Sequence, residues 1–219
     1  MKFDRIAAVS KSVGAAVVRC IPQAKNKICT LRNFHDFYLI HDMAVDNAKE
    51  YGCKHSLVTV ARLSEEKGLE QGVKTISTLK TAGYDVEWHI VGEGSQRTKI
   101  EKSIQENNAG NYIFLEGEQK NPYRYIKNAD YLFVPSLHEA APMVFDEAAS
   151  LGVPIISTDT LSAYELVAER KIGYVGSIEK LTSLVKKALS NQVETKKIME
   201  KYCANNDEAR ADFECLCND

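Results

Sequence analysis

Two glutamates at a fixed spacing are the residues of this 219-residue sequence best suited to bind a small polar molecule. Glu139 and Glu147 stand in residues 136–147, with seven residues between them. This segment follows an apolar run typical of a buried strand and continues into a helical pattern. A helix N-terminus presents free N–H groups and partial positive charge, which suit a phosphate or a sugar hydroxyl. We expect Glu139 to bond sugar hydroxyls and Glu147 a ribose diol; the alternative is that both are ordinary acids stabilised by the helix dipole.

Two cations follow another strand of the same kind. Arg62 and Lys67 stand in residues 61–68, directly after the apolar run 56–60. Arginine offers a fixed fork of donors and lysine a point charge, so the pair has the chemistry to neutralise a diphosphate leaving group. The alternative is a solvated loop with ordinary surface charge.

Two glycine-containing segments also follow predicted strands. Residues 91–95 match only the opening of a dinucleotide-binding fingerprint, because Arg97 takes the place of its third glycine. We interpret them as a turn. Backbone groups around Gly117 and Glu118 are placed to frame a nucleobase, the alternative being a plain loop between a strand and a helix.

The elements that position these residues alternate between strand and helix. Apolar runs predict strands over 56–60, 86–91, 112–115, 131–134 and 153–157. Helical periodicity predicts helices over 67–82, 95–108, 121–128 and 143–151. This alternation predicts an α/β fold with a Rossmann-like, doubly wound parallel sheet covered by helices on both faces. Ligands of such sheets bind at the carboxyl ends of the strands, where all four segments above are expected.

The ends of the chain differ from its middle. Residues 1–34 predict a strand (5–9), a helix opened by Ser10 and a strand (27–31), a βαβ unit too small to bury its own sheet. Residues 35–54 resemble a linker with a short helix. Terminal helices are predicted over 178–190 and 194–217. We therefore divide the chain into residues 1–34, a main domain over 35–190, and a carboxyl-terminal helical part over 191–219.

Composition excludes several classes of protein. The formal net charge is -2, from 28 basic and 30 acidic residues, and no basic block suggests a nucleic-acid partner. No apolar run approaches the roughly 20 residues of a membrane helix, and the amino terminus does not resemble a signal peptide. None of the six cysteines forms a C-x-x-C pair, which favours reduced thiols in the cytoplasm over a zinc or redox site.

Three segments in order resemble a known family. VARLSEEKG (60–68), HIVGEGSQRTKIE (89–101) and residues 114–159, which include SLHEAAPMVFDE, are similar to the carboxyl-terminal, donor-binding domain of retaining glycosyltransferases with the GT-B fold. These are enzymes of the bacterial surface-polysaccharide type, glycosyl transferases group 1. The likeness covers about residues 56–175 and implies one half of a GT-B fold.

The resemblance implies a role for each matching residue. Arg62 and Lys67 would hold the donor diphosphate. Glu139 would be the catalytic acid that lies against the transferred sugar, and Glu147 would hold the ribose. The loop that meets sugar and phosphate would be Ala141, Pro142, Met143 and Val144, and the base pocket would include Gly117 and Glu118. No metal and no cofactor are implied, because the basic pair and the helix end supply the positive charge.

The sequence departs from the family in two ways. Ala140 and Ala61 stand where the family usually has glycine, and at Ala140 the methyl group would restrict the loop's φ angle. The family also has two Rossmann-like domains, of which the first binds the acceptor, and only residues 1–34 resemble its end. The acceptor would therefore bind through a missing domain, and residues 194–217 would lack their usual packing partner.

The resemblance implies transfer, with retention, of a sugar from a nucleoside-diphosphate sugar to a glycan or lipid-linked acceptor. UDP is favoured only as the family's commonest donor type, and polysaccharide or capsule biosynthesis as the setting. The alternatives are a non-catalytic nucleotide-sugar-binding module, a half-enzyme that needs a partner chain, and another GT-B enzyme such as a 2-epimerase. We expect a cytoplasmic protein, with peripheral association at the inner membrane face left open.

Overall fold

Two parallel sheets organise the chain, of which the computed structural model describes residues 3–218. The larger sheet has the strand order β5-β4-β3-β6-β7-β8, and every neighbouring pair is parallel. Its strands are β3 (His55–Val60), β4 (Val86–Val91), β5 (Ile113–Gly117), β6 (Tyr131–Val134), β7 (Ile155–Thr158) and β8 (Gly173–Gly176). The smaller sheet pairs β1 (Ile6–Ala8) with β2 (Ile28–Thr30). The predicted α/β class is confirmed.

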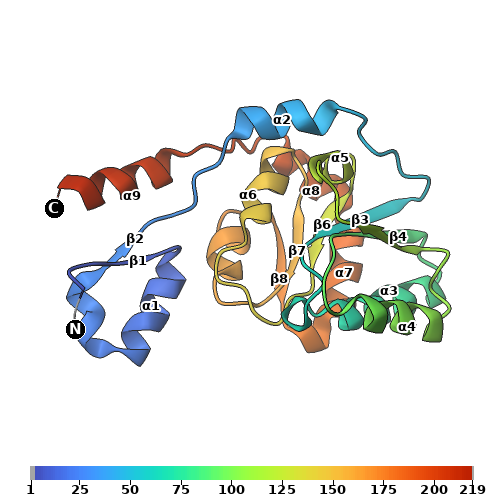
Figure 1. Cartoon of the computed structure of the whole chain (residues 1–219). Helices are drawn as coiled ribbons and strands as arrows, with labels where there is room; N and C mark the ends of the chain where they lie inside the picture. Colours follow the sequence, from blue (N-terminus) through green and yellow to red (C-terminus); the bar gives the residue numbers. More distant parts are fainter. Residues whose placement is uncertain (1–2, 219) are drawn as a thin grey trace.

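Helices cover both faces of the six-stranded sheet (Figure 1). One face carries α3 (Leu69–Thr81), α4 (Arg97–Glu106) and α7 (Leu181–Ser190). The other carries α2 (Phe37–Val45), α5 (Tyr123–Ile126), α6 (Met143–Ser150) and α8 (Gln192–Met199). Because side chains alternate along a strand, the fully buried neighbours Leu57 and Val58 of β3 enter the two different cores. The sheet is therefore doubly wound, as predicted.

The strand order reverses between β3 and β6, and this switch point places the predicted site. β3 is followed by residues 61–68, and β6 by the loop that leads into α6. The two segments meet, because the Leu137 N–H donates to the Glu66 carbonyl at 2.7 Å. Crevices of open α/β sheets form at such a point, so the fold brings the predicted cations and acids to one edge.

The sequence analysis missed the last strand. β4 and β6 have the predicted bounds, but β8 and the π-helical turn Tyr164–Ala168 before it were not predicted. β8 begins and ends in glycine and shows little apolar pattern. A Cβ at Gly173 would stand 2.0 Å from the Ile155 carbonyl oxygen, so glycine is needed there for the two backbones to approach.

The prediction of one helix over 194–217 is wrong. The structure has α8 and then α9 (Asp207–Asn218), with residues 200–206 between them. Asn206 explains the break, because its side chain accepts from the His35 N–H at 3.0 Å and donates to the His35 carbonyl at 2.8 Å. This tertiary contact fixes a non-helical segment that local sequence pattern does not reveal.

The small β1–β2 sheet and α1 (Lys11–Cys20) lie apart from the main sheet in Figure 1, and α9 extends toward them. Ser10 caps α1 as predicted, accepting from the Val13 N–H at 3.1 Å. α9 contacts β2, and Arg32 pairs with Asp212 at 2.7 Å. The last helix therefore packs against β2 and the residues that follow it, and the expectation that it lacks the rest of its usual partner stays a prediction. The assignment of residues 1–34 to an acceptor-binding domain stays a prediction.

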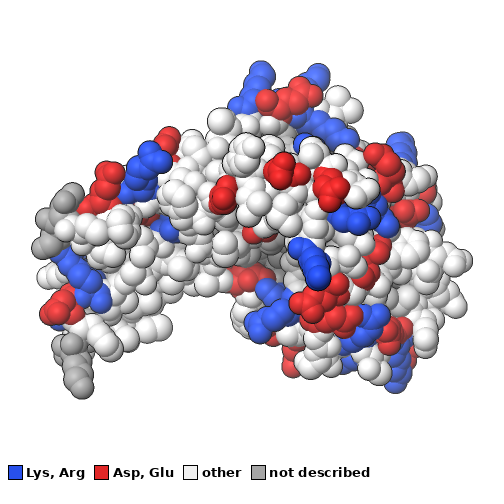
Figure 2. Space-filling view, turned by 45° about the horizontal axis from the view of Figure 1, so that its top comes forward, with Lys and Arg blue, Asp and Glu red and all other residues white. Residues whose placement is uncertain are grey.

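The surface carries both signs of charge. On the face in Figure 2, Lys and Arg are interspersed with Asp and Glu, and no broad basic field appears there. None of the helices within residues 3–218 is long and apolar enough to cross a membrane.

Candidate functional site

A cavity opens at the switch point of the sheet, and we call it the inner cavity. Its walls come from the end of β3, the end of β6, the loop after β6 and the first turns of α6. The lining residues are Thr59, Val60, Ala61, Lys67, Val134, Ser136, Glu139, Pro142, Met143, Val144 and Glu147. The structure therefore brings together the predicted lysine, both predicted acids and three of the four predicted loop residues.

Lys67 and Glu139 form an ion pair inside this cavity. Their Nζ and Oε1 atoms are 2.6 Å apart, and the side chains are only 18% and 13% exposed. Ser136 also donates its hydroxyl to Glu139 Oε1 at 2.8 Å. The predicted diphosphate cation and the predicted sugar-side acid thus neutralise each other. Sequence spacing did not predict this contact, which joins residues 72 apart in the chain.

Gly68 allows the lysine to reach the acid. Its φ is +60°, and a Cβ there would stand 2.1 Å from the Pro135 carbonyl oxygen. Only a residue without a side chain fits this close approach between the start of α3 and the loop after β6. The turn before Gly68 therefore places Lys67 over the loop that carries Glu139.

Glu147 lies one turn into α6 on the cavity wall. Burial raises the pKa of its carboxyl, against the smaller opposing effects of the His35 charge and of a hydrogen bond from Tyr123. The Tyr123 hydroxyl lies 3.5 Å from Glu147 Oε1. Burial and the Glu147 charge raise the pKa of Tyr123 in turn, so this phenol stays protonated as a donor. The sequence analysis missed Tyr123, whose place after Pro122 in a helical pattern was its only signal.

The loop into α6 ends in uncapped backbone. Pro142 is extended at the N-cap position, and no side chain of the described residues caps the helix. The first-turn N–H groups beside Met143, which is 49% exposed, are thus available to a ligand. Within residues 3–218, positive φ outside glycine occurs only at Asn47, Asn108 and Lys171. Ala140 and Ala61 therefore adopt ordinary backbone conformations, and the expected restriction does not arise.

Arg62 does not join Lys67. Its side chain is 83% exposed, and its contact is with Glu66 at 3.7 Å. It lines a second hollow, which we call the outer hollow and which shares Val60 and Ala61 with the inner cavity. The other lining residues are Val91, Gly92, Glu93, Glu118, Gln119 and Pro122. The predicted basic pair is thus divided between two adjacent sites.

The segments around Gly92 and Gly117 pack against the residues that line the outer hollow. A Cβ at Gly92 would stand 1.9 Å from the Ala61 carbonyl oxygen, so the turn interpretation holds and close packing explains it. Gly117 has a φ of +72°, and its carbonyl accepts from the Gly92 N–H at 2.8 Å. Glu118 lines the hollow, whereas Gly117 does not. Their role in base binding stays a prediction.

A buried polar cluster lies beneath Gly117. Glu116 Oε1 is 2.6 Å from His89 Nδ1 and 3.2 Å from Lys49 Nζ. Burial alone would raise the pKa of Glu116, but the hydrogen bonds from His89 and Lys49 lower it overall. The His89–Glu116 hydrogen bond ties β4 to β5. His89 is a packed histidine, buried beside Tyr51 and Phe114.

Metal ligands do not gather at either site. Across the described part of the chain, no group of three or more His, Cys, Asp or Glu side chains is arranged to hold a metal ion. The six cysteines are unpaired and lie exposed or half-buried.

Comparison with known proteins identifies the family and relatives of this chain. Residues 46–206 match the family model described as glycosyl transferases group 1. The amylovoran biosynthesis glycosyltransferase AmsK of Erwinia amylovora is 28% identical over 127 residues, which cover 54% of this chain and 31% of AmsK. The poly(glycerol-phosphate) alpha-glucosyltransferase of Bacillus subtilis is 30% identical over 164 residues, which cover 70% of this chain and 24% of that protein. The match thus spans a third or less of these relatives.

A solved structure shows the same fold. The S. aureus TarM structure, a G117R mutant in complex with fondaparinux, alpha-GlcNAc-glycerol and UDP, superposes with a TM-score of 0.78. It is 18% identical and covers 100% of this chain and 44% of TarM. The six-stranded sheet with its small βαβ neighbour is therefore one part of a GT-B architecture.

Proposed function

The chain belongs to the glycosyl transferases group 1 family, and we propose that it binds the nucleoside-diphosphate sugar from which a sugar is transferred. One observation carries this proposal. Lys67, Glu139, Glu147 and the uncapped start of α6 converge on a single cavity at the switch point of the sheet. In this proposal Lys67 and the start of α6 would bind the diphosphate, Glu139 the transferred sugar and Glu147 the ribose of such a donor.

The chemistry follows from where the charges lie. The Lys67 ammonium and the positive end of α6 face the place where a diphosphate would carry developing negative charge, and they would stabilise it as the glycosidic bond breaks. Half-buried charges act strongly because little water screens them. Glu139 would then release Lys67 and accept hydrogen bonds from hydroxyls of the transferred sugar.

Arg62 would complete the diphosphate site from outside. Its long side chain is exposed, and only the 3.7 Å contact with Glu66 opposes its turning toward a phosphate at the shared wall of the two sites. Retention of configuration, a UDP donor and a glycan or lipid-linked acceptor belong to the same proposal. The UDP bound in the TarM structure supports the choice of base.

Titration calorimetry with UDP, GDP and ADP tests the proposal. We expect one of the three to bind, and Glu147→Ala to weaken that binding about tenfold or more, because hydrogen bonds to a charged group contribute about 1.5–3 kcal/mol each. Glu106→Ala is the control, since this acid is exposed and its ion pair among the described residues is with Lys102, at 3.8 Å. Absence of binding by all three nucleotides, or binding that Glu147→Ala leaves unchanged, would contradict the assignment.

A second candidate is a half-enzyme that works with a separate acceptor-binding chain. The small unit and its surroundings favour it, because Phe3, Phe34 and Phe213 are 67%, 61% and 58% exposed. Co-expression with the neighbouring open reading frame tests this candidate. A stable complex that transfers sugar supports it, whereas transfer by the chain alone excludes it.

A further inference from the structure

The loop that leads into α6 accepts a hydrogen bond from a residue outside the six-stranded domain. Asn33 lies in the segment between β2 and α2, and its side-chain Nδ2 donates to the Ala141 carbonyl at 3.3 Å. The two residues are 108 positions apart. Pro142, the next residue, lines both the inner cavity and a pocket on the Asn33 side. The loop is thus a thin wall, with the proposed donor on one side and Asn33 on the other.

The orientation of the Ala141 carbonyl affects where the first N–H groups of α6 point. Proline has no N–H, and it confines the residue before it to extended conformations. The Ala141–Pro142 unit is therefore stiff, and its orientation fixes the direction in which α6 begins. The first N–H groups of α6 belong to Met143 and Val144, which line the inner cavity. Rotation of this one peptide would turn those N–H groups away from a bound phosphate or sugar.

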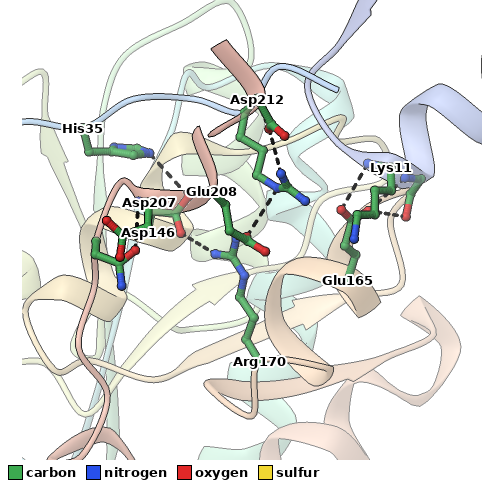
Figure 3. Close-up of polar contacts among 11 residues, drawn as sticks. Lys11, His35, Asp146, Glu165, Arg170, Asp207, Glu208 and Asp212 are labelled. Atoms are coloured by element: carbon green, nitrogen blue, oxygen red, sulfur yellow. Dashed lines mark hydrogen bonds and ion pairs between the residues drawn. The ribbon is translucent and has the colours of Figure 1, made fainter. Parts of the chain in front are cut away.

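A second contact fastens the same segment to the first turn of α6. His35 Nε2 lies 3.4 Å from Asp146 Oδ2, and Arg170 Nη1 lies 2.6 Å from Asp146 Oδ1 (Figure 3). Burial by itself would raise the pKa of Asp146, but the His35 hydrogen bond and the Arg170 charge lower it overall. The carboxylate is therefore a charged anchor that lines the pocket on the Asn33 side of α6, whereas the neighbouring Glu147 lines the inner cavity.

The segment that carries Asn33 is itself fixed by the carboxyl-terminal part of the chain. Arg32 reaches Asp212 of α9 at 2.7 Å and Glu208 at 3.4 Å, and Arg170 reaches Glu208 at 3.5 Å (Figure 3). The position of Asn33 thus depends on α9 and on the small sheet that α9 contacts, and not only on the six-stranded domain.

We infer that Asn33 is a positioning residue for the donor: its amide orients the Ala141–Pro142 peptide so that the first N–H groups of α6 face the diphosphate and sugar. This inference rests on the proposed function. It also assigns to the segment between the sheets a role in donor affinity that neither Glu139 nor Lys67 provides.

The test separates the two halves of the nucleotide. Wild type, Asn33→Ala and Asn33→Asp are titrated with the nucleoside diphosphate that wild type binds and with the matching nucleoside alone. Loss of one neutral hydrogen bond predicts about fivefold weaker binding of the diphosphate for Asn33→Ala. Asn33→Asp keeps the shape but places a carboxylate against the Ala141 carbonyl, so its loss is larger. Nucleoside affinity stays within about twofold, because Glu147 and the outer hollow are unchanged.

The matched control is Asn128→Ala. Asn128 makes the same kind of bond, from Nδ2 to the Lys49 carbonyl at 3.2 Å, and also donates to Glu50 Oε1 at 3.0 Å; it lines neither the inner cavity nor the outer hollow. We expect it to leave both affinities unchanged. Equal weakening of diphosphate and nucleoside by the Asn33 variants, or no change in either, would overturn the inference. Failure of wild type to bind any nucleotide would instead overturn the proposed function.

Discussion

The inner cavity and the outer hollow share a wall, yet they hold their charges in opposite ways. In the inner cavity Lys67 and Glu139 are 18% and 13% exposed and lie 2.6 Å apart. At the outer hollow Arg62 is 83% exposed and lies 3.7 Å from Glu66. Coulombic interactions strengthen as water is excluded, whereas exposed ion pairs contribute about 0–1 kcal/mol. Two cations only five positions apart are therefore expected to contribute unequally to diphosphate binding.

The largest effect, on the free energy of unfolding, should come from a substitution at Gly68, where the turn before α3 meets the loop after β6. Gly68→Ala places a methyl group 2.1 Å from the Pro135 carbonyl oxygen at a φ of +60°. Backbone strain and overpacking together predict a loss of about 2–4 kcal/mol in the free energy of unfolding. Urea denaturation measures this loss. The displaced turn should also carry Lys67 away from Glu139 and weaken nucleotide binding.

Gly83→Ala is the control for this substitution. Gly83 has a φ of +87°, but a Cβ there meets nothing within 4 Å. It therefore isolates the backbone strain, which we expect to be about 1 kcal/mol. Equal losses for the two variants would show that the close approach at Gly68 does not matter to the cavity.

Removing the half-buried cation tests the contrast directly. Lys67→Met keeps most of the side-chain volume but leaves Glu139 without its partner and the cavity without its ammonium. We expect about 2 kcal/mol weaker binding of the nucleoside diphosphate, roughly 30-fold, in calorimetric titration. Lys102→Met serves as the control, since Lys102 is 73% exposed and, within residues 3–218, forms its ion pair with Glu106. Unchanged affinity in Lys67→Met would remove Lys67 from the site.

The sequence predicted where these charges stand but not how they pair. Periodicity gave β4 and β6 with their observed bounds, and the rule that ligands bind after strands placed Lys67 and Glu139 at one edge. Neither argument says which way a side chain points. Lys67 turns inward because Gly68 lets the turn touch Pro135, and Arg62 turns outward toward Glu66.

Long-range contacts account for the other features that the sequence did not predict. β8 depends on a glycine that meets the Ile155 backbone, and the break before α9 depends on Asn206 bonding His35. Asn33 shows the same limit, since a lone asparagine after β2 has no local signal that it reaches Ala141. Local pattern finds elements, whereas contacts between distant segments set the walls of the site.

Neutralising Glu139 should strengthen binding of the nucleoside diphosphate, whereas removing the Lys67 charge should weaken it. Glu139→Gln frees the Lys67 ammonium from its 2.6 Å partner, while the amide still accepts from Ser136. We expect UDP, which has no sugar on its diphosphate, to bind about fivefold tighter, or about 1 kcal/mol. Calorimetry measures this gain. Weaker UDP binding would show instead that Glu139 holds the nucleotide itself.

The raised pKa of Glu147 predicts that nucleotide binding at the inner cavity depends on pH. Ribose hydroxyls donate to the ionised carboxylate, and burial raises the pKa of this carboxyl. Affinity should therefore fall about threefold as the pH drops through a value above the usual 4.3 or so of glutamate, because the protonated carboxyl still accepts from the ribose but only as a neutral group. Folding responds with the opposite sign, because a raised pKa in the folded state favours the protonated form and adds stability on acidification.

Glu147→Gln checks both parts of this prediction. The amide does not titrate, so the affinity and the free energy of unfolding should each lose that component of their pH dependence. Asp146 provides the comparison, because its pKa is lowered overall and its effect lies at lower pH. A profile identical to wild type would mean that another group titrates.

The smallest change in diphosphate affinity should come from a substitution at the outer hollow. Arg62→Ala removes a cation that is 83% exposed, and we expect about 0.5 kcal/mol weaker binding of the diphosphate, roughly twofold. Because water and salt screen an exposed charge, this loss should shrink further between low and high ionic strength. The loss caused by Lys67→Met should change much less, since that site is partly closed to solvent.

The salt dependences of the losses caused by Arg62→Ala and Lys67→Met distinguish the outer hollow from the inner cavity better than the affinities alone. If Arg62→Ala weakens binding as much as Lys67→Met and does so at high salt, Arg62 must leave Glu66 and become buried against the diphosphate. The difference between the two sites would then hold only without nucleotide, and binding would include closure of the shared wall at Val60 and Ala61. If the loss stays small and vanishes with salt, Lys67 and the start of α6 supply the charge that the leaving group needs.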